Sequence, residues 1–170
     1  MRSSTVTIRS VTEEDWREFR GLRLRMLEDT PIAFGETLEH ALRLPESEWR
    51  MRGRRGLEPR SALFVAIDDA TMEWVGTMGG YVPPTGAPLL VGVFVAPEYR
   101  GAAAGVADRL LAEVVDWARD YGTELALHVH EANPRAIRYY ERHGFANTGR
   151  RLTYELAPGG LEWEMTRPLA

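Results

Sequence analysis

The chain has 170 residues, of which 44% are hydrophobic and 27% charged, and its formal net charge is -4. This length suits one domain spanning residues 1–170, with enough apolar residues to build a core. The mild negative charge argues against a nucleic-acid-binding protein, which is normally basic, and no apolar run has the length of a membrane span. Cysteine is absent, which excludes disulfides, thiolate catalysis and cysteine-ligated metals. These features fit a cytoplasmic protein that binds neither nucleic acid nor a membrane.

The N-terminal half alternates strand-like and helical patterns. Thr12 is placed to cap a helix whose first turn carries three acidic residues. A second helical region is expected over residues 37–52, interrupted or begun afresh at Pro45. The arginine-rich stretch 50–60 is either a solvated linker or a basic surface for an anion. The strands expected in this half are residues 5–9, 61–67 and 72–82.

The stretch from Leu89 to Leu111 combines a strand, a loop of small residues and a helix. Residues 89–95 form an almost unbroken apolar and β-branched run, which predicts a buried strand ended by Pro97. Small residues follow, and apolar residues then recur at helical spacing up to Ala118. A helix N-terminus behind small residues offers free N–H groups to an anion, so this corner is a candidate phosphate site. Small residues used only for close packing are the alternative.

The remaining chain predicts a further βα unit and a closing hairpin. Residues 125–130 alternate as a strand, which should lie parallel to the strand at 89–95 in a right-handed βαβ unit. A helix is expected over 133–142. Residues 145–156 and 161–169 should pair as an antiparallel hairpin.

Two stretches resemble the motifs of the GNAT superfamily of N-acetyltransferases. Val95-Ala96-Pro97-Glu98-Tyr99-Arg100-Gly101 is similar to the start of that family's acyl-CoA pyrophosphate loop, V-x-P-x-x-R-G-x-G-x-G/A. The stretch from Asn133 to Phe145 is similar to the family's N-x-x-A-x-x-x-Y-x-x-x-G-F. The two stretches occur in the family's order and at about its separation, which makes the pair much more specific than either motif alone.

The sequence departs from the family's pattern inside the phosphate loop. Anchoring the pattern on Pro97 and Arg100 puts Ala103 at the family's middle glycine, whereas anchoring it on the helix leucines leaves two extra residues. We favour a loop longer by two residues, because helix periodicity is the firmer constraint. A left-handed backbone at Ala103 would cost about 1–2 kcal/mol and would weaken cofactor affinity.

The resemblance implies an α/β (α+β) GNAT fold. Its single mixed sheet would be mostly antiparallel, with six or seven strands, a splayed central parallel pair and about four flanking helices. The resemblance also implies acetyl-CoA as co-substrate, with its pantetheine arm lying between the two parallel strands. The cofactor-binding residues implied in this way are Val93, Phe94, Val95, Arg100, Gly101, Ala102, Ala103, Ala104, Gly105, Val106, Asn133 and Ala136.

The implied reaction is direct attack of a primary amine, carried by a small molecule or a peptide, on the thioester. Tyr140 would be the general acid on the leaving sulfur, since its spacing puts it on one helix face with Asn133 and Ala136. An aromatic side chain packed on the sheet is the structural alternative for Tyr140. The general base is left open among His128, His130, Glu131, Glu36 and Tyr81. No third ligand accompanies the two histidines, so no metal site is assigned.

A stretch from Leu22 to Gly35 resembles LRxxAL…PxAFG of many GNAT members, which there lies over the acceptor side of the cleft. This implies Phe34, Glu36 and Thr37 as acceptor-site residues, although Phe34 could equally pack between two helices. No motif identifies the acceptor amine. A non-catalytic acyl-CoA-binding module is the alternative to an enzyme, and a plain scaffold protein is a third reading. Homodimers are common in the family, and no residue here decides the oligomeric state.

Overall fold

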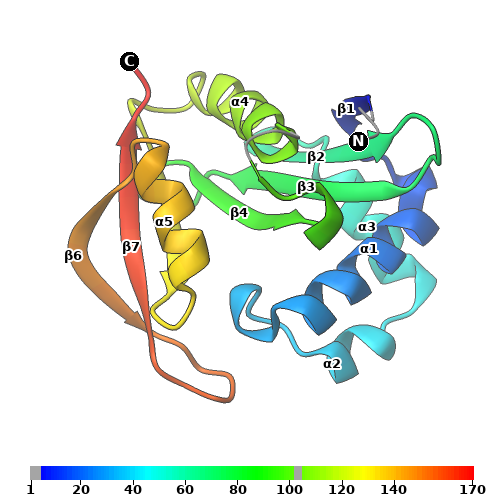
Figure 1. Ribbon diagram of the computed structural model, residues 1–170, viewed down its shortest axis with the longest axis horizontal. Helices are drawn as coiled ribbons and strands as arrows, with labels where there is room; N and C mark the ends of the chain where they lie inside the picture. The colour runs from blue at the N-terminus through cyan, green and yellow to red at the C-terminus, as the bar shows by residue number, and fades with distance from the viewer. Residues whose placement is uncertain (1–4, 102–104) are drawn as a thin grey trace.

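The computed structural model describes residues 5–101 and 105–170. They form a seven-stranded mixed sheet in the order β1-β2-β3-β4-β5-β7-β6, with five α-helices around it (Figure 1). Three residues of the expected phosphate loop, Ala102, Ala103 and Ala104, lie outside this description. No helix in the two described ranges is both long and apolar enough to cross a membrane.

The strands are β1 (Val6–Ser10), β2 (Ser61–Asp68), β3 (Trp74–Tyr81), β4 (Leu89–Val95), β5 (Glu124–His130), β6 (Ala146–Thr153) and β7 (Leu161–Pro168). The α-helices are α1 (Trp16–Asp29), α2 (Leu38–Leu42), α3 (Glu46–Arg55), α4 (Val106–Ala118) and α5 (Pro134–Arg142). Short 3-10 turns are η1 (Glu13–Asp15), η2 (Pro31–Ala33) and η3 (Pro97–Tyr99). All neighbouring strands are antiparallel except β4 and β5, which confirms the expected mixed sheet with one parallel pair.

Local sequence explains the boundaries of the first helices. The Thr12 backbone N–H donates to Oδ2 of Asp15 at 2.8 Å, which satisfies one of the free donors at a helix start. The expected helical region after Thr37 divides as anticipated, because α2 ends before Pro45 and α3 begins directly after it. Helix α3 runs on to Arg55, so the first half of the arginine-rich stretch is helical rather than a linker.

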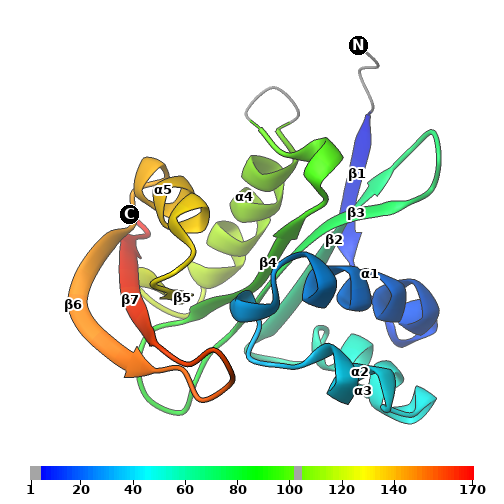
Figure 2. The same ribbon diagram turned by 60° about the horizontal axis from the view of Figure 1, so that its bottom comes forward.

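Helices cover both faces of the sheet. Helix α4 packs on one face of β2 and β3, and α1 and α3 lie on the opposite face (Figures 1 and 2). The buried residues of α4 recur at the predicted helical spacing: Val106, Leu110, Leu111, Val114, Val115 and Ala118. The hydrophobic core therefore lies on both faces of the central strands of the sheet.

The parallel pair separates soon after it forms. Within the described ranges, β4 and β5 pair through Leu89 with Ala126 and Leu90 with Leu127, and no later residues of the two strands are paired. On its other edge, β4 carries a β-bulge, because the register with β3 shifts just before Phe94. Gly92 lies in this bulge with φ at 61°, a left-handed backbone that favours glycine. The β4 edge beyond Leu90 is thus open toward β5.

Candidate functional site

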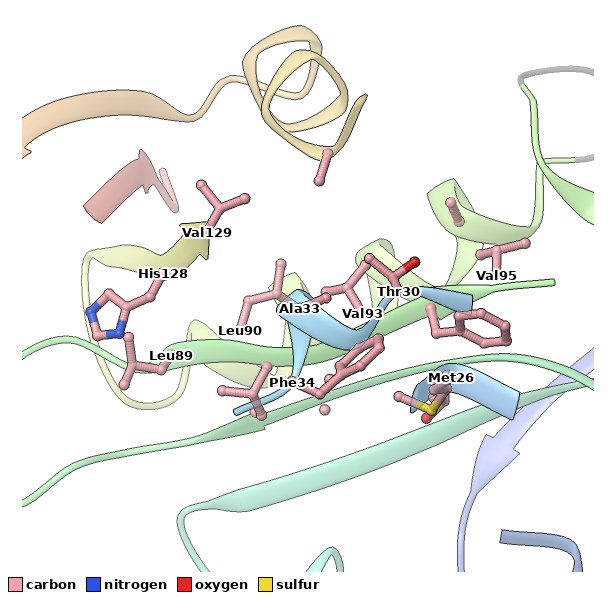
Figure 3. Close-up of a pocket in the computed structure, with 18 of the residues that line it drawn as sticks. Met26, Thr30, Ala33, Phe34, Leu89, Leu90, Val93, Val95, His128 and Val129 are labelled. Carbon is pink, nitrogen blue, oxygen red and sulfur yellow. The ribbon is translucent and has the colours of Figure 1, made fainter. Parts of the chain in front are cut away.

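The separation of β4 and β5 opens a cavity of about 1280 Å³. Its walls include α4 and α5 on one face of the sheet, and α1, α3 and the segment after η2 on the other. The side chains labelled in Figure 3 come from β4 (Leu89, Leu90, Val93, Val95), β5 (His128, Val129) and the end of α1 with η2 (Met26, Thr30, Ala33, Phe34). The cavity therefore passes through the sheet at the point where the parallel strands part.

Most of the residues predicted from sequence meet at this cavity. Those that line it are Val93, Phe94, Val95, Arg100, Gly101, Asn133, Ala136 and Tyr140. Gly105 and Val106 are not among its described lining residues. Instead Gly105 is the N-cap of α4 with φ at 66°, and the Val106 side chain is buried in the core at 1% exposure. These two residues shape the start of α4 rather than the wall of the cavity.

Arg100 is held by the protein itself. Its Nε donates to the carbonyl oxygen of Val95 at 2.8 Å, and its guanidinium pairs with the carboxylate of Asp29 on α1 at 2.5 Å. The guanidinium also lies over the Phe94 ring, 5.7 Å from its centroid. Arg100 thus ties the end of β4 to α1 and presents its remaining donors at the cavity wall.

Helix α5 brings Asn133, Ala136 and Tyr140 to the cavity, as their spacing predicted. Asn133 is the N-cap, and its side-chain oxygen accepts from the Ala136 backbone N–H at 3.4 Å. Tyr140 is 7% exposed, and its hydroxyl has no hydrogen-bond partner within residues 5–101 and 105–170. Burial raises the pKa of Tyr140, so the phenol is protonated at neutral pH and can donate.

A second set of polar side chains on the same wall was missed by the sequence analysis. Oδ1 of Asp108, in the first turn of α4, lies 2.9 Å from Nε2 of His143 and accepts from the Tyr139 hydroxyl at 3.2 Å. The rings of Tyr139 and His143 stack with their centroids 4.1 Å apart. Burial and the Asp108 charge together raise the pKa of Tyr139. This cluster links α4 to α5, and no sequence motif predicted it.

On the opposite wall, Glu36 is enclosed by two arginines. Its carboxylate accepts from Nε of Arg23 at 2.9 Å and from both terminal nitrogens of Arg52 at 3.1 and 2.8 Å. Burial acts to raise the pKa of Glu36, but the hydrogen bonds from Arg52 and Arg23 outweigh it and lower the pKa overall. Phe34 lines the cavity beside Glu36, with Arg23 over its ring, whereas Thr37 caps α2.

The five residues considered as bases occupy different positions. Glu36 is hydrogen-bonded as described, and both ring nitrogens of His130 are engaged, with Gly159 O at 2.7 Å and Ala132 N at 3.0 Å. Glu131 is not among the described lining residues, and its Oε1 accepts from the Leu161 N–H at 3.3 Å. His128 and Tyr81 line the cavity. Among the described residues no group of three or more side chains could hold a metal ion.

Comparison with known proteins identifies the relatives of this chain. A family model described as the acetyltransferase (GNAT) family matches residues 9–145. No curated protein sequence matches the chain.

Solved structures share its fold. A GNAT-family acetyltransferase from Streptococcus pneumoniae has a TM-score of 0.80 at 16% identity, over 98% of this chain and 100% of that one. A spermidine N-acetyltransferase from Vibrio cholerae, in complex with CoA and spermine, has a TM-score of 0.72 at 19% identity, over 96% and 95%. A nourseothricin acetyltransferase has a TM-score of 0.58 at 26% identity, over 66% and 67%. Because the family model spans most of the chain and the expected motifs meet at one cavity, this protein belongs to the GNAT family of acetyltransferases.

Proposed function

We propose that this protein transfers the acetyl group of acetyl-CoA to a primary amine of a small molecule or peptide. One observation carries the proposal: the cavity passes through the sheet where β4 and β5 part, and it is lined by Tyr140, whose hydroxyl has no hydrogen-bond partner among the described residues. A thioester substrate and an amine could therefore approach one another from opposite faces of the sheet. Such an arrangement suits direct transfer between two bound substrates.

The residues around the cavity fit coenzyme A. The backbone edge of Val93 and Phe94 that faces β5 has no strand partner among the described residues, so it can pair with the amides of a pantetheine arm, whereas the Val95 carbonyl oxygen already accepts from Arg100. Arg100 and the N-terminus of α4 suit a diphosphate by charge and by free N–H groups. Asn133 supplies a carboxamide on the same wall, and the small Ala136 leaves room beside it.

Tyr140 would assist departure of the sulfur. As the amine nitrogen forms its bond to the carbonyl carbon, the C–S bond breaks and its electron pair goes to sulfur. The Tyr140 hydroxyl then donates its proton to the thiolate, the nitrogen loses one proton to solvent to give the amide, and the phenolate regains a proton from solvent. A phenol whose pKa is raised by burial remains a donor at neutral pH, which supports this role.

The proposed acceptor class is drawn from the substrates that the names of related structures give. One neighbour is a spermidine N-acetyltransferase in complex with CoA and spermine, and another is a nourseothricin acetyltransferase. Both names denote amine-bearing small molecules, which supports a primary amine as the acceptor here. The cavity lining includes both positively and negatively charged side chains, among them Arg52, Arg55 and Glu162.

Two measurements test the proposal. Thermal-shift titration should show stabilisation by CoA and by acetyl-CoA, because a ligand that binds the folded state raises its stability. Thiol release from acetyl-CoA should then depend on one member of an amine panel containing spermidine, nourseothricin and a peptide with a free N-terminus. Stabilisation by CoA without thiol release would instead indicate a non-catalytic acyl-CoA-binding module. The absence of any CoA-dependent shift would overturn both readings.

A further inference from the structure

The arginine-rich stretch 50–60 reaches the cavity on the face of the sheet opposite α4. A Cβ at Gly80 would collide with Trp117 of α4, so Gly80 faces that helix and the next residue, Tyr81, faces the other way. Ser61 is the partner of Tyr81 in the β2–β3 register, so these two side chains are neighbours on the face opposite α4. Both of them line the cavity.

Arg55, in the last turn of α3, is brought to the same part of the cavity. A Cβ at the following residue, Gly56, would lie 2.5 Å from the Cβ of Leu63, so the end of α3 packs closely on β2. Leu63 is two residues along β2 from Ser61 and therefore shares its face. We refer to Arg55, Ser61 and Tyr81 together as the Arg55 corner.

The polar groups of the Arg55 corner are available to a ligand. Within residues 5–101 and 105–170, neither hydroxyl has a hydrogen-bond partner, and the guanidinium of Arg55 has no carboxylate partner and contacts Sδ of Met51 at 3.6 Å. Two other arginines of α3 differ in this respect, since Arg52 and Arg54 each pair with a carboxylate. A guanidinium and two hydroxyls can together donate several hydrogen bonds to one carboxylate, and the planar guanidinium matches the carboxylate in shape.

One acidic side chain of the cavity carries the opposite charge without an ion pair. Glu36 and Glu48 both contact Arg52. Glu162 on β7 also lines the cavity, and it forms no ion pair with any residue that the structure describes. Strand β7 lies beyond β5, whereas the Arg55 corner lies at β2 and β3, so the two charges are on opposite sides of the place where β4 and β5 part. Such an arrangement favours an acceptor with a cationic and an anionic end, its amine directed away from Arg55.

The Arg55 corner lies two strands away from the place where β4 and β5 part. Ser61 pairs with Tyr81, and Tyr81 pairs with Leu89 of β4. The next residue, Leu90, makes the last described pair of β4 with β5. Neighbouring strands are about 4.8 Å apart, so β2 lies roughly 10 Å from β4. Leu89, labelled in Figure 3, gives the cavity an apolar surface between the two places.

Resting on the proposed acetyl transfer, we propose that the acceptor is a primary amine that also carries a carboxylate, and that the Arg55 corner binds this carboxylate. An extended residue spans about 3.3–3.6 Å, so a tripeptide with free ends bridges the distance from the reacting nitrogen to the corner. The corner lies on the face opposite α4, whose N-terminus is the proposed diphosphate site, so it serves the acceptor and not CoA. The contact is the same before and during the reaction, so it acts on KM more than on kcat.

Triglycine and triglycine amide are a matched pair of acceptors, because they differ only in the terminal charge. For the unmodified protein, kcat/KM should be about ten-fold higher with triglycine, since the amide loses the charge-assisted hydrogen bonds of the carboxylate. Arg55→Gln should make the two acceptors equal. Arg54→Gln is the matched control, because Arg54 pairs with Glu13 and is not among the described lining residues, so this variant should keep the ten-fold difference.

Charge reversal provides a second test. Arg55→Glu should prefer triglycine amide and spermidine to triglycine, because a carboxylate then faces the far end of the acceptor. Ser61→Ala and Tyr81→Phe should each reduce the preference for triglycine by about three-fold, the effect of losing one hydrogen bond. All four variants of the Arg55 corner should keep the thermal shift with CoA, which shows that they are folded and that the CoA site is intact.

Two results would overturn the carboxylate site and leave the acetyl transfer intact. One is an equal kcat/KM for triglycine and its amide in the unmodified protein, and the other is turnover of spermidine without turnover of triglycine. Absence of thiol release with every amine would instead overturn the transfer itself. Calorimetric titration of the CoA-saturated protein with triglycine and its amide then tests the corner without turnover, and equal or absent binding of the two peptides would overturn it.

Discussion

Arg52 donates two hydrogen bonds to the carboxylate of Glu36, at 3.1 Å to Oε1 and 2.8 Å to Oε2. Arg23 approaches the same carboxylate from α1, at 2.9 Å. Through Glu36, the segment after η2 is held against both α1 and α3. This segment also carries Phe34 at the cavity wall, so the ion pairs fix part of the wall that we propose binds the acceptor.

Replacing Glu36 should therefore destabilise the protein. Glu36→Gln keeps the shape but removes the carboxylate partner of Arg23 and leaves Arg52 with its longer contact to Glu48 at 3.4 Å, at a place where the Glu36 side chain is 8% exposed. We expect a loss of about 2–4 kcal/mol in the free energy of unfolding, measured by urea denaturation at pH 7. Glu39→Gln is the control, since its pair with Arg43 is 74% exposed and should be worth less than about 1 kcal/mol. Equal losses for the two variants would contradict the argument.

The same carboxylate makes stability depend on pH. Its pKa in the folded protein lies below its ordinary value, so its contribution is present above the unfolded value of about 4.3 and is lost as pH falls through the folded pKa. The stability difference between the unmodified protein and Glu36→Gln should thus narrow below about pH 4. Urea denaturation at about pH 7, 5 and 3.5 measures this difference. A difference in the free energy of unfolding that stays constant over these pH values would contradict the proposed contribution of the Glu36 carboxylate.

Periodicity in the sequence was enough to predict the strand, helix and strand around the cavity. The apolar run at 89–95 and the helical spacing up to Ala118 correspond to β4 and α4 as observed. Both patterns are local, and each follows directly from which face is buried. The cavity residues of α5 were found for the same reason, because Asn133, Ala136 and Tyr140 share one helix face.

Features that depend on distant partners could not be predicted. The β-bulge at Gly92 depends on the register with β3, which no local pattern specifies, although a glycine inside a strand was an available hint. The partners of Arg100 and Glu36 lie on other elements. The expected helix stopped at Arg52, and its continuation to Arg55 was not predicted. Gly53, a poor helix former, lies at that point because a Cβ there would come within 2.6 Å of the Thr12 carbonyl oxygen.

Removing the Tyr140 hydroxyl tests its proposed role in catalysis. Tyr140→Phe should lower kcat by at least about ten-fold, because the departing sulfur loses its proton donor. The affinity for acetyl-CoA, measured by thermal shift, should change little. Tyr121→Phe removes a hydroxyl that contacts the Arg60 backbone on another part of the surface, and its kcat should be unaffected. Unchanged turnover in Tyr140→Phe would reject the general-acid role.

Arg100 is expected to serve both stability and cofactor binding. Arg100→Ala removes the hydrogen bond to Val95 and the ion pair with Asp29, so stability should fall by about 1–2 kcal/mol. It should also weaken CoA binding but leave pantetheine binding unchanged, because pantetheine lacks the diphosphate. Asp29→Asn keeps the guanidinium and should retain CoA affinity. Calorimetric titration with CoA and with pantetheine measures both affinities. If Arg100→Ala weakened the binding of the two ligands equally, Arg100 would not contact the diphosphate.

Gly92 and Gly21 form a matched pair for testing the bulge. A Cβ added at either position meets nothing within 4 Å, so packing is not at issue at either site. Gly92 has φ at 61°, and an alanine there should cost roughly 1–2 kcal/mol of stability through backbone strain. Gly21 lies in the interior of α1, where alanine should instead add about 0.5–1 kcal/mol. Urea denaturation should therefore show a lower free energy of unfolding for Gly92→Ala and a higher one for Gly21→Ala. A neutral Gly92→Ala would mean that β4 can relax its bulge, in which case CoA affinity should still fall, because the backbone edge proposed to hold the pantetheine arm would have changed its register.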